Sequence, residues 1–355
     1  MAIDRWMRGL ALLGVVVCFG VIVLGAYVRL TDAGLGCPDW PGCYGHISPV
    51  GAEDSPASQA QFPGRPLQAG KAWHEMIHRY AAGALGCIII VIAALAIAAR
   101  KPKVVGSGFG LLLFATVIVQ AVLGMLTVTL LLKPLIVTLH LLFGMTTLAL
   151  LWWVWLRLQR HSHGGGVHLR TVSGYGAPAW SGAGTATRAA YGLAILSVVV
   201  LGVQFFLGAW TSANYAAFAC PDFPTCQGAW WPHADFKDAF VLWRGLSIDF
   251  QGGILASPAR VAIHLTHRLG ALTVTVTFLV TTVFVISRRA LAPARTRAYL
   301  VLAALGLQLA IGISMVLKAF PLWLTDAHTA GAALLLMAIL ALTAKLHVMR
   351  AVRAA

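Results

Sequence analysis

Apolar stretches of about 20 residues, long enough to cross a bilayer as a helix, follow one another along the chain and are separated by polar segments. Period-2 alternation is absent, and helices satisfy their own backbone groups within lipid. We therefore predict an all-α polytopic membrane protein with eight spans, near residues 10–30, 72–99, 107–132, 135–156, 190–211, 261–287, 298–318 and 324–347.

The second half of the chain repeats the first. The cysteine motif Cys37-Pro-Asp-Trp-Pro-Gly-Cys43 recurs as Cys220-Pro-Asp-Phe-Pro-Thr-Cys226. The motif E-M-I-H-R, which ends at Arg79, has its counterpart in H-L-T-H-R, which ends at Arg268. The motifs Q-A-V-L-G and Q-L-A-I-G then precede His140 and His328 at the same spacing. A duplication at this scale predicts two homologous four-helix bundles, at 1–157 and 188–355, joined by the linker 158–187.

Charge gives the expected orientation. With an even number of spans both termini lie on one side, and that side carries sixteen of the 26 basic residues: Arg5, Arg8, Arg100, Lys101, Lys103, Arg157, Arg160, Arg170, Arg188, Arg288, Arg289, Arg295, Arg297, Lys345, Arg350 and Arg353. We expect cytoplasmic termini and outer cysteine loops. The net charge of +15 then reflects this bias and contacts with anionic membrane lipids, and no nucleic-acid partner is expected. His161, His163 and His168 lie in the Gly- and Ser-rich linker and are read as solvated.

Four histidines fall at similar depths on the even-numbered spans: His78, His140, His267 and His328. At ~1.5 Å per residue they lie roughly 5–10 Å below the outer boundary. Ionisable residues inside a membrane usually mark function, although each could simply bond a neighbouring helix. Paired neutral imidazoles in an apolar setting suit the axial ligation of haem iron. Arg29, Arg79 and Arg268 lie near this level and are candidate contacts for haem propionates, with snorkelling to the interface as the alternative.

The segment from His74 to His78 also fits H-E-x-x-H, the zinc metalloprotease signature. The second copy has His264 in place of Glu75, and the sequence offers no obvious third zinc ligand, so no zinc is expected. Glu75 lies one turn from His78 on the same helix face. A carboxylate in only one copy suggests that one half performs chemistry and the other holds a permanent cofactor.

The two cysteine pairs, Cys37 with Cys43 and Cys220 with Cys226, lie in outer segments, where disulfides persist. They are interpreted as structural staples, or as redox-active pairs near the site. Cys18 and Cys87 lie within spans and are read as small hydrophobic residues.

Taken together, these motifs resemble the haem A synthase family of bacterial inner membranes and mitochondria, over nearly the whole chain. The resemblance implies an oxidoreductase that converts haem O to haem A by oxidising a porphyrin methyl group to formyl. It implies haem O between His78 and His140, catalytic Glu75 beside it, and resident haem b between His267 and His328. The implied partners are a haem O synthase (a farnesyltransferase) and the assembly machinery of a terminal oxidase, and a homo-oligomer is compatible with it.

Two other functions fit the four histidines. One is a di-haem b-type cytochrome that only transfers electrons, and the other is a haem or quinone binder that handles disulfides. A pure electron carrier gives no reason for Glu75 in one site only. Analysis of the bound pigments discriminates between the functions, because a synthase should contain haem O or haem A beside haem b, whereas a cytochrome should contain haem b alone.

Overall fold

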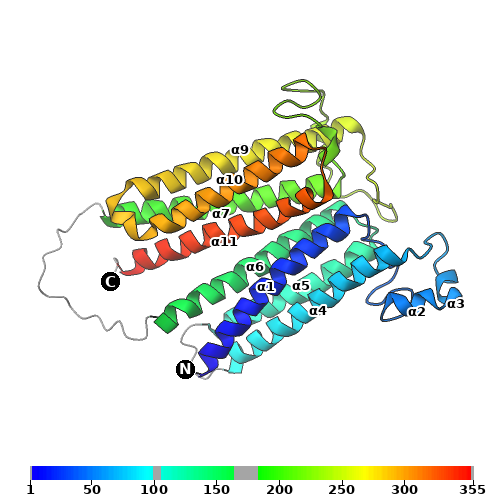
Figure 1. Ribbon diagram of the computed structural model, residues 1–355, viewed down its shortest axis with the longest axis horizontal. Helices are drawn as coiled ribbons and strands as arrows, with labels where there is room; N and C mark the ends of the chain where they lie inside the picture. The colour runs from blue at the N-terminus through cyan, green and yellow to red at the C-terminus, as the bar shows by residue number, and fades with distance from the viewer. Residues whose placement is uncertain (1, 99–104, 164–182, 353–355) are drawn as a thin grey trace, which may run out of the picture.

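Long helices make up almost the whole of the computed structural model, which describes residues 2–98, 105–163 and 183–352 (Figure 1). Eight of them are long and apolar enough to cross a membrane, and no strand occurs in the described ranges, where two isolated bridges are the only β pairing. The predicted all-α fold with eight spans is confirmed. The long helices are α1 (Ala2–Leu30), α4 (Ala69–Ala98), α5 (Ser107–Thr129), α6 (Pro134–His163), α7 (Ala183–Ala213), α9 (Ser257–Ser287), α10 (Arg295–Leu317) and α11 (Leu322–Val352).

Several helices run past the predicted span ends. Residues 158–163 of the predicted linker form the end of α6, and residues 183–187 form the start of α7. Hydropathy marks only the part of a helix that lies in lipid, whereas backbone hydrogen bonding continues into polar sequence. The rest of the linker, including His168, lies outside the described residues.

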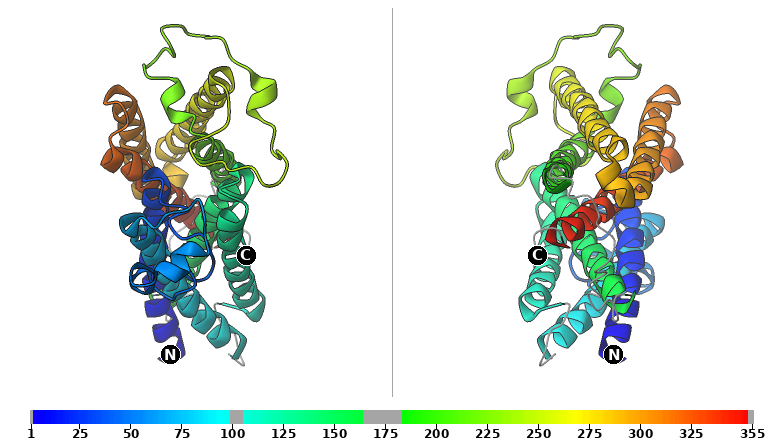
Figure 2. Two further views of the ribbon diagram at one scale, coloured as in Figure 1. Left: turned by 90° about the vertical axis from the view of Figure 1, so that its right-hand side faces the viewer. Right: turned by 90° about the vertical axis from the view of Figure 1, so that its left-hand side faces the viewer.

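The long helices form two groups. In the first group α1 packs on α4 and α6, and α5 contacts both α4 and α6. In the second group α7 packs on α9 and α11, and α10 contacts both α9 and α11 (Figures 1 and 2). Contacts of α6 with α7 and of α11 with α1 and α6 connect the groups. A continuous apolar core, which includes Cys18, Leu148, Phe278 and Ile339, extends through both. The homology of the two halves stays a prediction.

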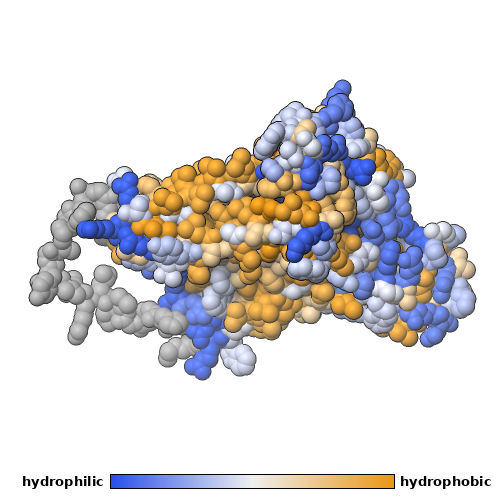
Figure 3. All heavy atoms as spheres, turned by 45° about the horizontal axis from the view of Figure 1, so that its top comes forward, coloured by the Kyte–Doolittle hydropathy of each residue, from blue (hydrophilic) through white to orange (hydrophobic). Residues whose placement is uncertain are grey.

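Short elements and loops connect these helices at the end of the molecule opposite the chain termini (Figure 1). They are α2 (Pro49–Glu53), α3 (Pro56–Ala60), η1 (Ala217–Ala219) and α8 (Phe236–Ala239), with η2 (Arg289–Ala294) at the other end. The helix flanks between the two ends are largely apolar (Figure 3), and many large side chains there, such as Val199, Val203 and Leu300, are exposed. The chain is thus a multi-pass membrane protein.

Four hydrogen bonds between the two groups and their loops join residues 183 to 185 positions apart, close to the repeat offset. One of them runs from Arg65 Nη2 to Asp249 Oδ2 at 2.8 Å, across 184 residues. Arg29 Nη2 donates to the carbonyl of Ser212 at 2.6 Å, across 183 residues. Tyr215 donates its hydroxyl to Asp32 at 2.8 Å, also across 183 residues. Trp152 Nε1 donates to the carbonyl of Met337 at 2.9 Å, across 185 residues. The pairs Arg29 with Ser212 and Asp32 with Tyr215 have the 183-residue offset of the cysteine motifs, so corresponding positions of the two copies meet there.

Candidate functional site

Each of the four histidines lies against a glycine of a neighbouring helix. A Cβ added to Gly25 of α1 would lie 2.9 Å from Cε1 of His78, on α4. A Cβ added to the corresponding glycine would lie 3.5 Å from Cε1 of His140 at Gly124, 3.1 Å from Cε1 of His267 at Gly208, and 2.9 Å from Cε1 of His328 at Gly312. Real Cβ contacts at 2.9 Å essentially do not occur, so at least two of these rings occupy space that only glycine leaves.

We group the four rings as two pairs. His78 and His140 lie on α4 and α6 of one helix group, and His267 and His328 lie on α9 and α11 of the other. All four side chains are only partly buried. In the described part of the chain, Nδ1 of His78 and Nδ1 of His140 are buried and have no hydrogen-bond partner. Imidazoles with unpartnered nitrogens in one helix group are a donor set that would suit haem iron.

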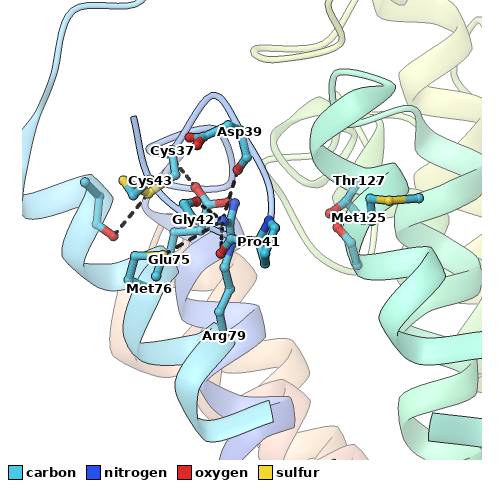
Figure 4. Close-up of polar contacts among 12 residues, drawn as sticks. Cys37, Asp39, Pro41, Gly42, Cys43, Glu75, Met76, Arg79, Met125 and Thr127 are labelled. Atoms are coloured by element: carbon cyan, nitrogen blue, oxygen red, sulfur yellow. Dashed lines mark hydrogen bonds and ion pairs between the residues drawn. A yellow bond between two sulfur atoms is a disulfide. The ribbon is translucent and has the colours of Figure 1, made fainter. Parts of the chain in front are cut away.

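Glu75 lies beneath the first cysteine loop (Figure 4). It is 4% exposed, its Oε2 accepts a hydrogen bond from the amide of Cys37 at 2.8 Å, and its Oε1 forms an ion pair with Arg79. These two donors hold the buried carboxylate in one orientation. The sequence predicted that Glu75 and His78 share a helix, but not that the carboxylate contacts the loop of the cysteines.

Arg79 also holds that loop in place by hydrogen bonds to its backbone, and we call such an arginine a clamp. Its Nη1 donates to the carbonyls of Asp39, Pro41 and Gly42, at 3.0, 3.1 and 2.5 Å (Figure 4). These bonds hold the loop against α4 at the same guanidinium that pairs with Glu75.

Arg268 clamps the second loop in the same way. It donates to the carbonyls of Asp222 at 2.7 Å, Thr225 at 2.8 Å and Cys220 at 3.2 Å. Arg29 bonds Ser212 and lies 3.9 Å over the ring of Tyr215. The three arginines proposed for propionates thus all have protein partners, and the propionate contacts stay predictions.

The second site lacks the carboxylate. His264, which stands where Glu75 stands in the first copy, is buried, and its Nδ1 lies 3.3 Å from the carbonyl of Ala216. Arg268 bonds the loop above it, but among the described contacts no carboxylate of α9 accepts a bond from a loop amide. The two sites therefore differ by one carboxylate.

The cysteine pairs are at disulfide distance, with S–S separations of 2.04 Å for Cys37–Cys43 and 1.98 Å for Cys220–Cys226. In both loops the aspartate two residues after the first cysteine accepts two backbone amides. Asp39 accepts from Tyr44 at 2.6 Å and Gly45 at 2.8 Å, and Asp222 from Gln227 at 2.6 Å and Gly228 at 3.0 Å. In the second loop, hydrogen bonding led by the Thr225 hydroxyl lowers the pKa of Asp222. The two loops are thus built alike.

Of the other cysteines, Cys18 is buried in the apolar core and Cys87 is exposed, on a helix flank of this membrane protein.

The zinc-signature residues have other partners. The His74 ring packs edge-on against Tyr27 at 5.0 Å, and Glu75 binds Arg79 and Cys37. Within the described residues, no group of three or more His, Cys, Asp or Glu is arranged to hold a metal ion.

Lys133 is a structural residue that sequence reasoning missed. It is 2% exposed, and its Nζ donates to the carbonyls of Arg244, at 3.3 Å, and Gly245. The ammonium also lies 4.2 Å from the centre of the Trp243 ring. Lys133 therefore ties the turn before α6 to the long segment before α9. The sequence did contain a signal for this role, because Lys133 stands between apolar residues and Pro134, just before a predicted span.

Comparisons with known proteins agree with this architecture. The model of the COX15-CtaA family, described as cytochrome oxidase assembly protein, matches residues 8–340. A haem A synthase of Shewanella oneidensis is 39% identical over 321 residues, 89% of each chain. A haem A synthase of Rhizorhabdus wittichii is 25% identical over 360 residues, 96% of this chain and 92% of the relative. Because the family model matches nearly the whole chain and the Shewanella relative is so similar, this chain belongs to the COX15-CtaA family.

Proposed function

We propose that this protein is a membrane oxidoreductase that converts haem O to haem A by oxidising a ring methyl group to formyl. The observation that carries the proposal is the asymmetry between the sites: the first histidine pair has Glu75 one turn away, and the second has His264. Membership of the COX15-CtaA family and the named haem A synthases support the same activity.

In this proposal His78 and His140 hold haem O as substrate, and His267 and His328 hold a resident haem b. Their pairing, their glycine cradles and the unpartnered nitrogens of the first pair support these roles. A bound haem b would supply electron transfer, chemistry that side chains alone do not provide. The protein supplies the ligands, a buried carboxylate and an apolar surrounding.

Glu75 is the catalytic residue of the proposal. Arg79 and the Cys37 amide hold its carboxylate in one orientation. From there it can accept a proton or stabilise positive charge that develops near the methyl group. Arg79 completes the site by fixing both the carboxylate and the loop that supplies the amide.

We place the protein in a bacterial inner membrane, with both termini cytoplasmic and the cysteine loops periplasmic. The basic residues near the ends of α6, α9 and α10 and at the termini support this orientation. Haem O would arrive from a farnesyltransferase-type haem O synthase, and haem A would pass to the assembly of a terminal oxidase.

The test is pigment analysis in a bacterial strain that makes haem O and lacks its own haem A synthase. Expression of this chain should produce haem A, identified by chromatography and mass spectrometry of the extracted haems. The purified protein should contain haem b together with haem O or haem A. Haem b alone in two equal sites, with no haem A in the cells, would instead support the electron-transfer cytochrome.

A further inference from the structure

Two glutamines contact the rings of the second histidine pair. Gln204 of α7 has its Nε2 3.0 Å from Nδ1 of His267 and 3.0 Å from the carbonyl of the same residue. Gln308 of α10 has its Nε2 3.2 Å from Nδ1 and 3.3 Å from Nε2 of His328, and 3.1 Å from the His328 carbonyl. Each amide thus holds both the backbone and the imidazole of a proposed ligand.

The contact depends on one glycine in each of the two helices: one glycine leaves room for the histidine ring, and the other leaves room for the glutamine amide. Gln204 stands one helical turn before Gly208, which cradles the His267 ring, and its own amide fills the space above Gly270 of α9. Gln308 and Gly312 meet His328 and Gly331 in the same way. A Cβ at either Gly270 or Gly331 would collide with the glutamine Oε1, so the amides are closely confined.

The first histidine pair lacks this contact. Gln120 of α5 donates to the carbonyl of His140 at 3.2 Å, but among the described contacts its amide does not bond the ring, and Nδ1 of His140 is unpartnered. At the position of the first copy that corresponds to Gln204, the chain has Val21. No glutamine amide is therefore available to the His78 ring from that position, and its Nδ1 has no partner within the described structure.

We propose that Gln204 and Gln308 are positioning residues that lock the imidazoles of His267 and His328, so that this pair retains its haem while the first pair exchanges it. The inference rests on the proposed function, which makes one haem a substrate and the other a resident. A substrate site must release its product, and fewer contacts to its ligands suit that requirement.

The chemistry of the lock follows from the imidazole tautomer. A neutral histidine that binds iron through Nε2 carries its proton on Nδ1 and donates it to a neighbouring acceptor. The Oε1 atoms of Gln204 and Gln308, like that of Gln120, are buried without a partner in the described structure. In the second pair the amide already touches the ring, so a small turn of the imidazole brings its Nδ1–H to Oε1 while the glutamine Nε2 keeps its bond to the carbonyl. The hydrogen bond then fixes the tautomer and the ring plane and makes the imidazole a stronger donor to iron.

The experiment compares Gln204→Leu and Gln308→Leu with Gln120→Leu in the purified full-length haem protein. All three changes remove an amide that packs against a glycine and bonds a histidine carbonyl, but only the first two remove a contact to a ring. Haem loss is followed by transfer of haem b to excess apomyoglobin in detergent. We expect Gln204→Leu and Gln308→Leu to release haem b about 10- to 100-fold faster than the parent protein, and Gln120→Leu to release it at the parent rate.

A second readout separates the hydrogen bond from packing. Loss of the acceptor weakens donation by the imidazole, so the midpoint potential of haem b should rise in both Leu variants. Gln308→Glu keeps an acceptor oxygen, so it should retain haem b, and its potential should not rise.

Three results would overturn the inference: equal haem b release from all three Leu variants, unchanged potentials in Gln204→Leu and Gln308→Leu, or a raised potential in Gln308→Glu. Failure of the underlying function is recognised separately, because cells that express the parent chain would then make no haem A and the purified protein would hold haem b in both sites.

Discussion

The backbone amide of Cys37 donates a hydrogen bond to the carboxylate of Glu75 across 38 positions of sequence. The disulfide loop and the catalytic candidate are therefore one structural unit, since Arg79 bonds both. The second loop has the same shape and the same arginine clamp but no carboxylate to orient. The two disulfides should consequently differ in their effect on activity.

Opening the first disulfide should impair haem A formation far more than opening the second. Without the Cys37–Cys43 link the loop can move, and a misplacement of about 1 Å at a reacting group can cost on the order of 10²-fold in rate. The measurement is the haem A content of cells that express the double serine variant of each pair. A similar loss from Cys220→Ser with Cys226→Ser would show that the loops act only in folding.

Glu75→Ala should retain haem b and accumulate haem O. Its removal leaves His267 and His328 untouched, and loss of a proton-transfer or charge-stabilising group typically costs about 10²-fold or more. Glu75→Gln keeps the size but cannot ionise, so we expect it to be nearly as impaired. The check is the ratio of haem A to haem O in extracts, and a near-normal ratio in either variant would remove Glu75 from the chemistry.

His267→Ala and His328→Ala should each abolish the low-spin haem b spectrum. Both rings are proposed axial ligands, and a single imidazole cannot hold low-spin six-coordinate iron by itself. Reduced-minus-oxidised spectra of the purified variants provide the test. The haem b assignment fails if both variants keep the full signal.

Gly312→Ala should disturb haem b, whereas Gly124→Ala should be tolerated. The added Cβ would lie 2.9 Å from the His328 ring in the first case and 3.5 Å from the His140 ring in the second. The first distance forces the ring to move, and the second is an ordinary contact. Haem spectra and haem content distinguish the two, and an unperturbed Gly312→Ala would mean that the ring adjusts without cost.

Lys133→Met should loosen the segment before α9. It leaves the carbonyls of Arg244 and Gly245 without their donor, a loss of about 1–3 kcal/mol. Thermal unfolding in detergent and tryptic cleavage at Arg244 report the change. Lys318→Met is the matched control because Lys318 is exposed; equal effects from the two changes would argue against a specific clamp.

The fold was largely predictable because lipid imposes one rule on every span: an apolar stretch of sufficient length becomes a helix. The repeat then marked the four histidines and the cysteine pairs as candidates, and its interruption at His264 marked Glu75. The contacts of Arg79 and Lys133 were not predictable in the same way. They depend on which loop carbonyls the folded chain brings beside a cation, and carbonyls leave no mark in a sequence.

The glutamines are an intermediate case. Gln120 and Gln308 were visible as parts of the repeated motif, but the spacing alone did not separate a glutamine that bonds a ring from one that bonds a carbonyl. The difference arises from the close fit of each amide over a glycine on the adjacent helix.

The contacts of Arg29 with Ser212 and of Asp32 with Tyr215 have a consequence for the ancestry of such a molecule. In a symmetric pair of identical chains, a residue on the two-fold axis meets its own copy, and Arg29 would face a second arginine. A single fused chain escapes that restriction, because the two sides of the axis mutate independently. Unlike side chains, such as the carboxylate of Asp32 and the phenol of Tyr215, become available at the seam, and the same freedom allows Glu75 to exist on one side only.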